Sequence, residues 1–249
     1  MKSLTASVRR RSRMAGALAL VAAAVSCAAS APNEPIPEAV TVVESPANDS
    51  LRYQSLTQAD YDAVAQELGI PTAAIRAVVE IEAGPQGKGF NPDNKPIINF
   101  DLTMFTQACR RHGIHLARYK SSHAVVFRAP DRKKYGSYQA AQYARLNSAM
   151  TIDTVAALEG TFWGMFQIGG FNWKQCGCSS VQEFVELMSY SEREQLELFA
   201  QFLKQQNLVG YIRNRQWAKF ALRYNGPGYK KHGYDTRMAR AFAKYSRQP

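Results

Sequence analysis

The segment PTAAIRAVVEIEAG, residues 71–84, carries the pattern on which the fold assignment depends. Proline is favoured in the first turn of a helix, and a glycine followed by a proline ends one. Apolar residues recur at the i, i+3 and i+4 spacing of a buried helical stripe, at Ile75, Val78 and Val79. The next position on that stripe, i+7, is Glu82. We therefore predict a helix over residues 71–83 with a carboxylate on its core-facing side.

The position of Glu82 suits a general acid. Burial disfavours the charged form of a carboxylate, so its pKa rises and the group can hold a proton near neutral pH. A general acid needs that property. Glu80 lies roughly 160° round the same helix and is predicted to face solvent. The alternative is that Glu82 is a core-edge carboxylate paired with one of the many basic residues.

Two later segments combine aromatic rings, amides and glycines. They are FWGMFQIGGFN, residues 162–172, and YNGPGY, residues 224–229. Glycines allow a sugar or a backbone to approach closely, and rings and amides suit the apolar faces and hydroxyls of a carbohydrate. The candidate sugar contacts in the first segment are Trp163, Phe166, Gln167 and Asn172. Each segment taken alone could equally be a packed aromatic turn.

Four motifs in this order resemble the N-acetylmuramidase family, over about residues 51–247. They are VEIEAG at 79–84, YARL at 143–146, FWGMFQI at 162–168 and YNGP at 224–227. The resemblance implies a mainly α, lysozyme-like helical domain with a small β lobe beside the cleft. It also implies cleavage of the β-1,4 bond between N-acetylmuramic acid and N-acetylglucosamine, with Glu82 as catalytic acid and no metal or organic cofactor. By motif position, Gln167, Tyr224 and Asn225 would place sugars or water.

The chain departs from the family pattern after the first loop. Where the family is expected to have a Phe-Glu-x-His segment, this chain reads Phe100-Asp101-Leu102-Thr103. Asp101 is our candidate for a second catalytic carboxylate. The alternatives are a lytic transglycosylase, which uses the same acid without water, and a murein-binding protein that has lost catalysis.

The N-terminus predicts export to the periplasm or cell envelope. Residues 1–31 combine a basic start with a short alanine-rich apolar run, as in an export signal. The signal ends either before Cys27, leaving a lipidated cysteine, or at the Ala29-Ser30-Ala31 cleavage sequence. Residues 32–50 form an acidic tether that contains prolines, and residues 51–249 form one catalytic domain. The membrane would be contacted only through a lipid on Cys27.

The formal net charge of +11 favours a polyanionic partner. Nucleic acid is one candidate, but an exported protein would not meet it. Peptidoglycan glycan strands, with their lactyl and stem-peptide carboxylates, are the partner we expect, for a monomeric protein.

Capping sequences predict three helix starts, at Thr57 with Asp60, Ser180 with Glu183, and Ser191 with Glu194. Two further helices are expected over residues 211–222 and 235–245. Short apolar runs predict strands at residues 97–98 and 124–127.

The cysteines predict a disulfide in an exported chain. It would join Cys109 to either Cys176 or Cys178, leaving one free thiol. Their spacing, with His112 and His115 nearby, matches no standard zinc pattern, so no metal site is expected.

Overall fold

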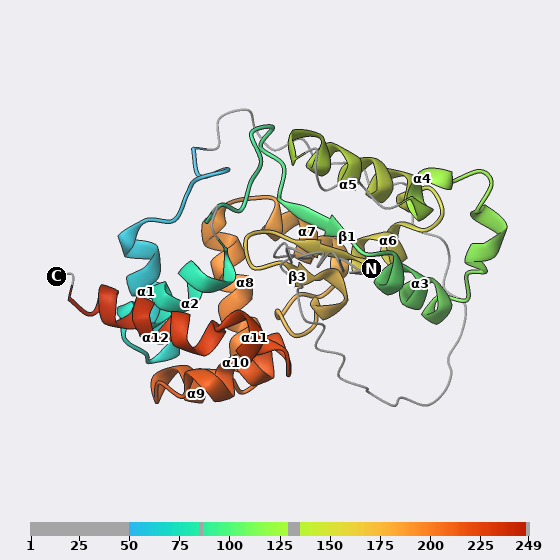
Figure 1. The fold of residues 1–249 in the computed structure, drawn as a ribbon. Coiled ribbons are helices and arrows are strands. Elements are labelled where there is room, and N and C mark those ends of the chain that lie inside the picture. Colours follow the sequence, from blue (N-terminus) through green and yellow to red (C-terminus); the bar gives the residue numbers. More distant parts are fainter. Residues whose placement is uncertain (1–49, 85–86, 129–134, 248–249) are drawn as a thin grey trace, which may run out of the picture.

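The computed structural model describes residues 50–84, 87–128 and 135–247. Within them the chain forms twelve α-helices, two short 3₁₀ helices and one small antiparallel sheet (Figure 1). The mainly α class with a small β component is therefore confirmed. The export signal and almost all of the tether lie outside the described residues.

Two capped helices open the domain, α1 (Gln58–Leu68) and α2 (Thr72–Glu82). The predicted capping box at Thr57 is confirmed, because its side chain accepts from the backbone of Asp60 and the Asp60 carboxylate accepts from the Thr57 backbone. Gly69 ends α1 in the left-handed conformation, at φ 60°. The stripe predicted for α2 is buried, with 5% exposure or less at each of Ile75, Val78 and Val79.

The sheet is built from β1 (Ile98–Phe100), β2 (Thr161–Trp163) and β3 (Ile168–Gly169), in that order. In its antiparallel register Ile98 pairs with Trp163, and Phe162 pairs with Gly169. The aromatic segment thus supplies two of the three strands.

The middle of the chain is helical and packs against the sheet. Its elements are α3 (Leu102–Arg111), the 3₁₀ helix η1 (Leu116–Tyr119), α4 (Ala124–Phe127), α5 (Tyr135–Met150) and α6 (Thr154–Glu159). The strand predicted for residues 124–127 is wrong, since these residues form α4. A four-residue apolar run fits a buried helical turn as well as a strand. Here Val126 is fully buried, and its carbonyl accepts two hydrogen bonds from the Arg145 guanidinium on α5.

The C-terminal half begins with the 3₁₀ helix η2 and adds six helices. They are η2 (Gly170–Asn172), α7 (Val181–Met188), α8 (Glu192–Gln205), α9 (Val209–Arg213), α10 (Trp217–Asn225), α11 (Tyr229–His232) and α12 (Tyr234–Tyr245). Ser180 and Ser191 cap α7 and α8 as predicted. The single helix expected over residues 211–222 is instead α9 and α10, because Arg215 adopts a left-handed φ of 54° between them. The predicted helix at 235–245 is confirmed as α12.

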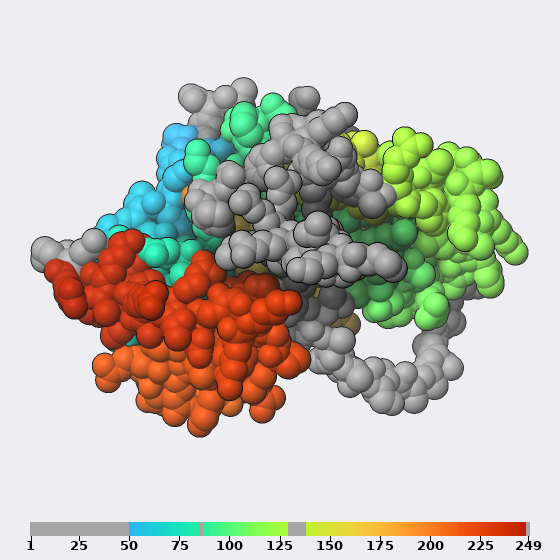
Figure 2. Space-filling model, viewed as in Figure 1, coloured from blue at the N-terminus to red at the C-terminus, as the bar shows by residue number. Residues whose placement is uncertain are grey.

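The last helix packs along the second. α12 runs beside α2 (Figure 1), and Lys244 of α12 forms an ion pair with Glu80 of α2 at 2.7 Å. The space-filling view shows the C-terminal helices gathered in one part of the molecule and the α3–α5 segment in another (Figure 2). The end of α2 therefore lies beside α12, the last of these helices.

The predicted disulfide is not formed. Cys109, Cys176 and Cys178 are buried free thiols. Cys109 lies near Asp153, whereas Cys176 lies near Cys178 and Tyr224, so the two groups occupy different parts of the core. Burial raises the pKa of the Cys109 and Cys178 thiols to about 11. In the described residues no group of three or more His, Cys, Asp or Glu side chains is placed to hold a metal ion.

Candidate active site

Glu82 is the last residue of α2, and its side chain lies mostly among protein atoms. Nδ2 of Asn225 donates a hydrogen bond to its Oε1 at 3.0 Å. Removal from water raises the pKa of Glu82 to about 7, although the Asn225 bond and the charge of Arg237 act in the opposite direction. The negative end of the α2 dipole also disfavours an ionised carboxylate there. The carboxyl group therefore holds its proton to a much higher pH than an ordinary glutamate does.

Asn225 reaches Glu82 because α10 ends at this residue. Gly226 follows it with a φ of 76°, a conformation that favours glycine, and turns the chain away. The neighbouring Tyr224 stacks on Phe220, with ring centroids 5.5 Å apart, and meets Phe199 edge-on at 5.6 Å. These aromatic contacts fix the end of α10, and with it the amide that holds Glu82.

Tyr224 and Phe166 belong to the same aromatic stack. Phe166 lies flat on Phe199 at 4.2 Å and is only 4% exposed. The Tyr224 hydroxyl donates to the Phe166 carbonyl at 3.5 Å. Burial raises the pKa of Tyr224, and the nearby Glu82 carboxylate raises it further. The structure thus brings together Glu82, Tyr224 and Asn225, and Phe166 supports them from within the core.

Two of the other candidate sugar contacts, Trp163 and Gln167, have internal partners. Trp163 is 3% exposed, and its Nε1 donates to the Leu158 carbonyl at 3.1 Å. Gln167 has a left-handed φ of 48° and donates from Nε2 to the carbonyls of Gly164, at 2.8 Å, and Ile97, at 3.2 Å. Asn172 is partly exposed at the end of η2. The Trp163 ring therefore presents almost no face to a sugar, and Gln167 closes the β2–β3 turn.

The glycines of the aromatic segment permit close packing of the protein on itself. A Cβ on Gly170 would lie 2.1 Å from the Leu158 carbonyl oxygen. Gly164 has a φ of 69°, and a Cβ there would lie 2.7 Å from Oε1 of Gln195. These close approaches explain why glycine interrupts so aromatic a segment.

Two residues of α8 hold the loops around the site, and the sequence reasoning did not identify them. The Glu192 carboxylate accepts from the backbone of Gly89 at 2.7 Å and of Leu56 at 3.1 Å. Gln195 accepts from Met165 at 2.8 Å and donates to the Met188 carbonyl at 2.8 Å. Their positions on one helical stripe with Phe199, at the i, i+3 and i+7 spacing, were visible in the sequence, but their distant partners were not.

Two residues of α12, Arg237 and Tyr234, lie close enough to Glu82 to interact with its charge and were not predicted. Arg237 lowers the pKa of Glu82. Burial raises the pKa of Tyr234, with a further contribution from Glu82. No local pattern in α12 could have shown this, because the pairing depends on how α12 packs against α2.

Glu80 and Asp101 have other partners. Glu80 was expected to face solvent, and it lies at the surface but accepts from Lys244 at 2.7 Å and from the Tyr245 hydroxyl at 2.5 Å. Asp101 caps α3, where its Oδ1 accepts from the backbone of Met104 at 2.8 Å. Glu80 therefore ties α12 to α2, and Asp101 stands where β1 passes into α3.

A carboxyl group of raised pKa at the end of a helix suits general acid chemistry, and a family match and a similar solved structure show a glycoside hydrolase of the lysozyme type. The chain belongs to the N-acetylmuramidase family, whose sequence model matches residues 71–246. It is also similar to the crystal structure of the Burkholderia AP3 phage endolysin, with 37% sequence identity and a TM-score of 0.68. That match covers 80% of this chain and 74% of the endolysin chain. No curated protein matches this chain significantly. The family match and the similarity to an endolysin together show that the protein is an enzyme that hydrolyses peptidoglycan.

Proposed function

We propose that the protein cleaves the β-1,4 bond between N-acetylmuramic acid and N-acetylglucosamine, with Glu82 as general acid. The observation that carries the proposal is the Glu82 carboxyl group, whose pKa of about 7 lets it donate a proton at neutral pH. The Asn225 amide holds this group at 3.0 Å. The similarity to a phage endolysin supports the same substrate.

In the proposed mechanism Glu82 protonates the glycosidic oxygen as the bond breaks. Its carboxylate is then stabilised by the Asn225 amide and by the positive charge of Arg237, the two groups that lower its pKa. Asn225 also orients the acid. The proposed contacts to sugar or water are Tyr224, Gln167 and Asn172. The rings of Trp163 and Phe166 are buried, and we propose that they support these contacts from the core.

We propose Asp101 as the second carboxylate, which would hold the attacking water. Its Oδ1 is occupied by the α3 cap, while Oδ2 makes no hydrogen bond to the described residues. One observation favours the rival route, a lytic transglycosylase. Among the described residues, no other carboxylate contributes to the pKa of Glu82. The two routes give different products.

A zymogram with purified cell walls tests the proposed function. The wild-type protein is expected to produce a cleared band in a gel containing murein. A murein-binding protein without catalysis would pellet with insoluble murein and clear nothing, and a structural lipoprotein would do neither. Absence of clearing by folded wild-type protein would refute the proposal.

We also propose export, with Cys27 as a lipid anchor at the end of a signal in residues 1–31. No helix in the described part of the chain has the length and apolar character needed to cross a membrane. Because a lipid on Cys27 would be the anchor, Cys27→Ser is expected to move the protein from the membrane fraction to the soluble exported fraction, as followed by fractionation and immunoblotting. Wild-type protein that is already soluble, with its N-terminus beyond residue 27, would contradict the anchor.

A further inference from the structure

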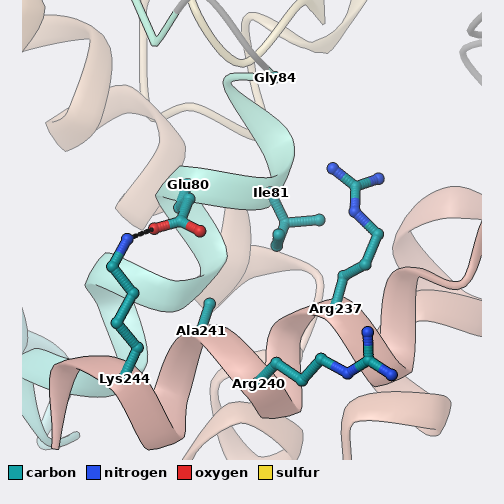
Figure 3. Close-up of a pocket in the computed structure, with 7 residues that line it drawn as sticks. All are labelled: Glu80, Ile81, Gly84, Arg237, Arg240, Ala241 and Lys244. Carbon is teal, nitrogen blue, oxygen red and sulfur yellow. Dashed lines mark hydrogen bonds and ion pairs between the residues drawn. The ribbon is translucent and has the colours of Figure 1, made fainter.

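A pocket of about 440 Å³ opens between the end of α2 and α12. Its lining consists of Glu80, Ile81, Gly84, Arg237, Arg240, Ala241 and Lys244 (Figure 3). Figure 3 shows Arg237 extending beside Ile81 toward the end of α2, with Arg240 one turn further along α12. Both guanidinium groups lie on the side of the pocket away from Lys244 and Glu80.

The pocket has more positive than negative charge. Its only carboxylate is that of Glu80, which already accepts from Lys244 and from Tyr245. Among the described residues neither Arg237 nor Arg240 forms an ion pair, although Arg237 lies 5.8 Å from the centre of the Tyr234 ring and its charge acts on Glu80 and Glu82. Two planar guanidinium groups are thus left to bind a ligand, and such groups bind carboxylates through paired hydrogen bonds.

The pocket adjoins the proposed acid. Arg237 lines the pocket and is also close enough to Glu82 to lower its pKa. Gly84, on the opposite wall, lies only two residues beyond Glu82. A glycan strand whose scissile bond reaches Glu82 would therefore carry the substituents of its muramic acid past these arginines.

We propose that Arg237 and Arg240 form a carboxylate-binding subsite for the side chain on the muramic acid ring. The carboxylate comes either from the stem peptide or, on strands without peptides, from the free lactyl group. This inference rests on the proposed function, because it takes murein as the substrate. In this proposal α12 helps to select glycan strands that carry a carboxylate near the scissile bond, a function separate from cleavage of that bond.

Binding to a catalytically blocked protein tests the subsite. The full-length Glu82→Gln protein is titrated by calorimetry with three kinds of soluble glycan strand. These are peptide-bearing strands, the same strands with their carboxylates converted to amides, and strands whose peptides have been removed by an amidase. Arg240→Gln is compared with Arg110→Gln, which removes the same charge from an exposed position on α3.

Arg240→Gln is expected to weaken binding of peptide-bearing strands by about 3- to 10-fold, the range for a charge-assisted contact at a partly exposed site. It should have no effect on amidated strands, and Arg110→Gln should leave both affinities unchanged. Because the lactyl carboxyl of a peptide-bearing strand is bound in the amide link to the peptide, an effect on those strands assigns the carboxylate to the stem peptide. An effect on peptide-free strands alone assigns it to the free lactyl group. Equal effects of the two arginine changes on every kind of strand would overturn the subsite alone. Failure to bind any strand would overturn the proposed function as well.

Discussion

Glu82→Gln is expected to slow the release of fragments from murein by about 10²- to 10⁴-fold, the usual contribution of a general acid. The substitution removes the proton but keeps the volume. The Asn225 amide can still donate to the remaining oxygen, as it does to Oε1 of Glu82 at 3.0 Å. The fold should therefore survive, as judged by circular dichroism and a cooperative unfolding transition. The rate is measured as reducing ends released per minute from purified murein.

Glu80→Gln is the matched change two residues away. It breaks the ion pair with Lys244, which lies at the surface, where such pairs contribute little to stability. Because Glu80 does not contact Asn225, we expect any loss of rate to be no more than a few-fold. A similar large loss from both substitutions would remove the basis for assigning the acid to Glu82.

The raised pKa of Glu82 also predicts how the stability of the fold depends on pH. The pKa of Glu82 rises from 4.5 in the unfolded chain to about 7 in the fold. Between these values the folded protein keeps a proton that the unfolded chain releases, so the free energy of unfolding falls as pH rises. The loss is on the order of 2 to 3 kcal/mol. Urea unfolding at pH 4.5 and pH 8 should show this loss in the wild type, whereas Glu82→Gln should lack it and be the more stable protein at pH 8.

The helical part of the fold could be read from sequence because its signals are local. The cap at Thr57 and the stripe ending at Glu82 depend on residues within one or two turns of a helix, and both are present. The strand predicted for residues 124–127 is wrong, because a run of four apolar residues is too short to show whether its hydrophobic periodicity is that of a strand or of a helix. What decides their structure is the distant Arg145, whose guanidinium donates to the carbonyls of Val126 and Phe100.

The site was only partly readable for the same reason. Glu82 could be proposed as the acid because its position on the buried stripe of its own helix is unusual for a carboxylate. The sequence indicated that the aromatic segment, residues 162–172, could contact a sugar. It could not show that Phe166 stacks on Phe199 rather than facing outward. Arg237 was missed, because only the packing of α12 against α2 brings it near the acid. Contacts between elements far apart in the chain have no signature in either element.

The expected chemical outcome is hydrolysis, with reducing-end muramic acid as the main product. Hydrolysis and transglycosylation both begin with protonation by Glu82, and they differ in whether water or the C6 hydroxyl of the sugar captures the glycosyl centre. Water is usually held by a second carboxylate, about 5–5.5 Å from the acid in retaining enzymes and about 6.5–9.5 Å in inverting ones. No described acid contributes to the pKa of Glu82. The expectation of hydrolysis therefore rests on the family to which the chain belongs and not on a second acid that acts on Glu82.

Asp101→Asn tests the proposed second carboxylate. Asparagine caps helices as well as aspartate does, so the bond from the Met104 backbone should remain and the unfolding temperature should stay the same. If the Asp101 carboxylate activates water, release of reducing-end muramic acid should slow by at least about tenfold. Mass spectrometry of the fragments separates the outcomes. An unchanged rate would limit Asp101 to its capping role. Products dominated by 1,6-anhydromuramic acid would refute hydrolysis and leave Glu82 as the acid, because the transglycosylase route needs that proton and no water.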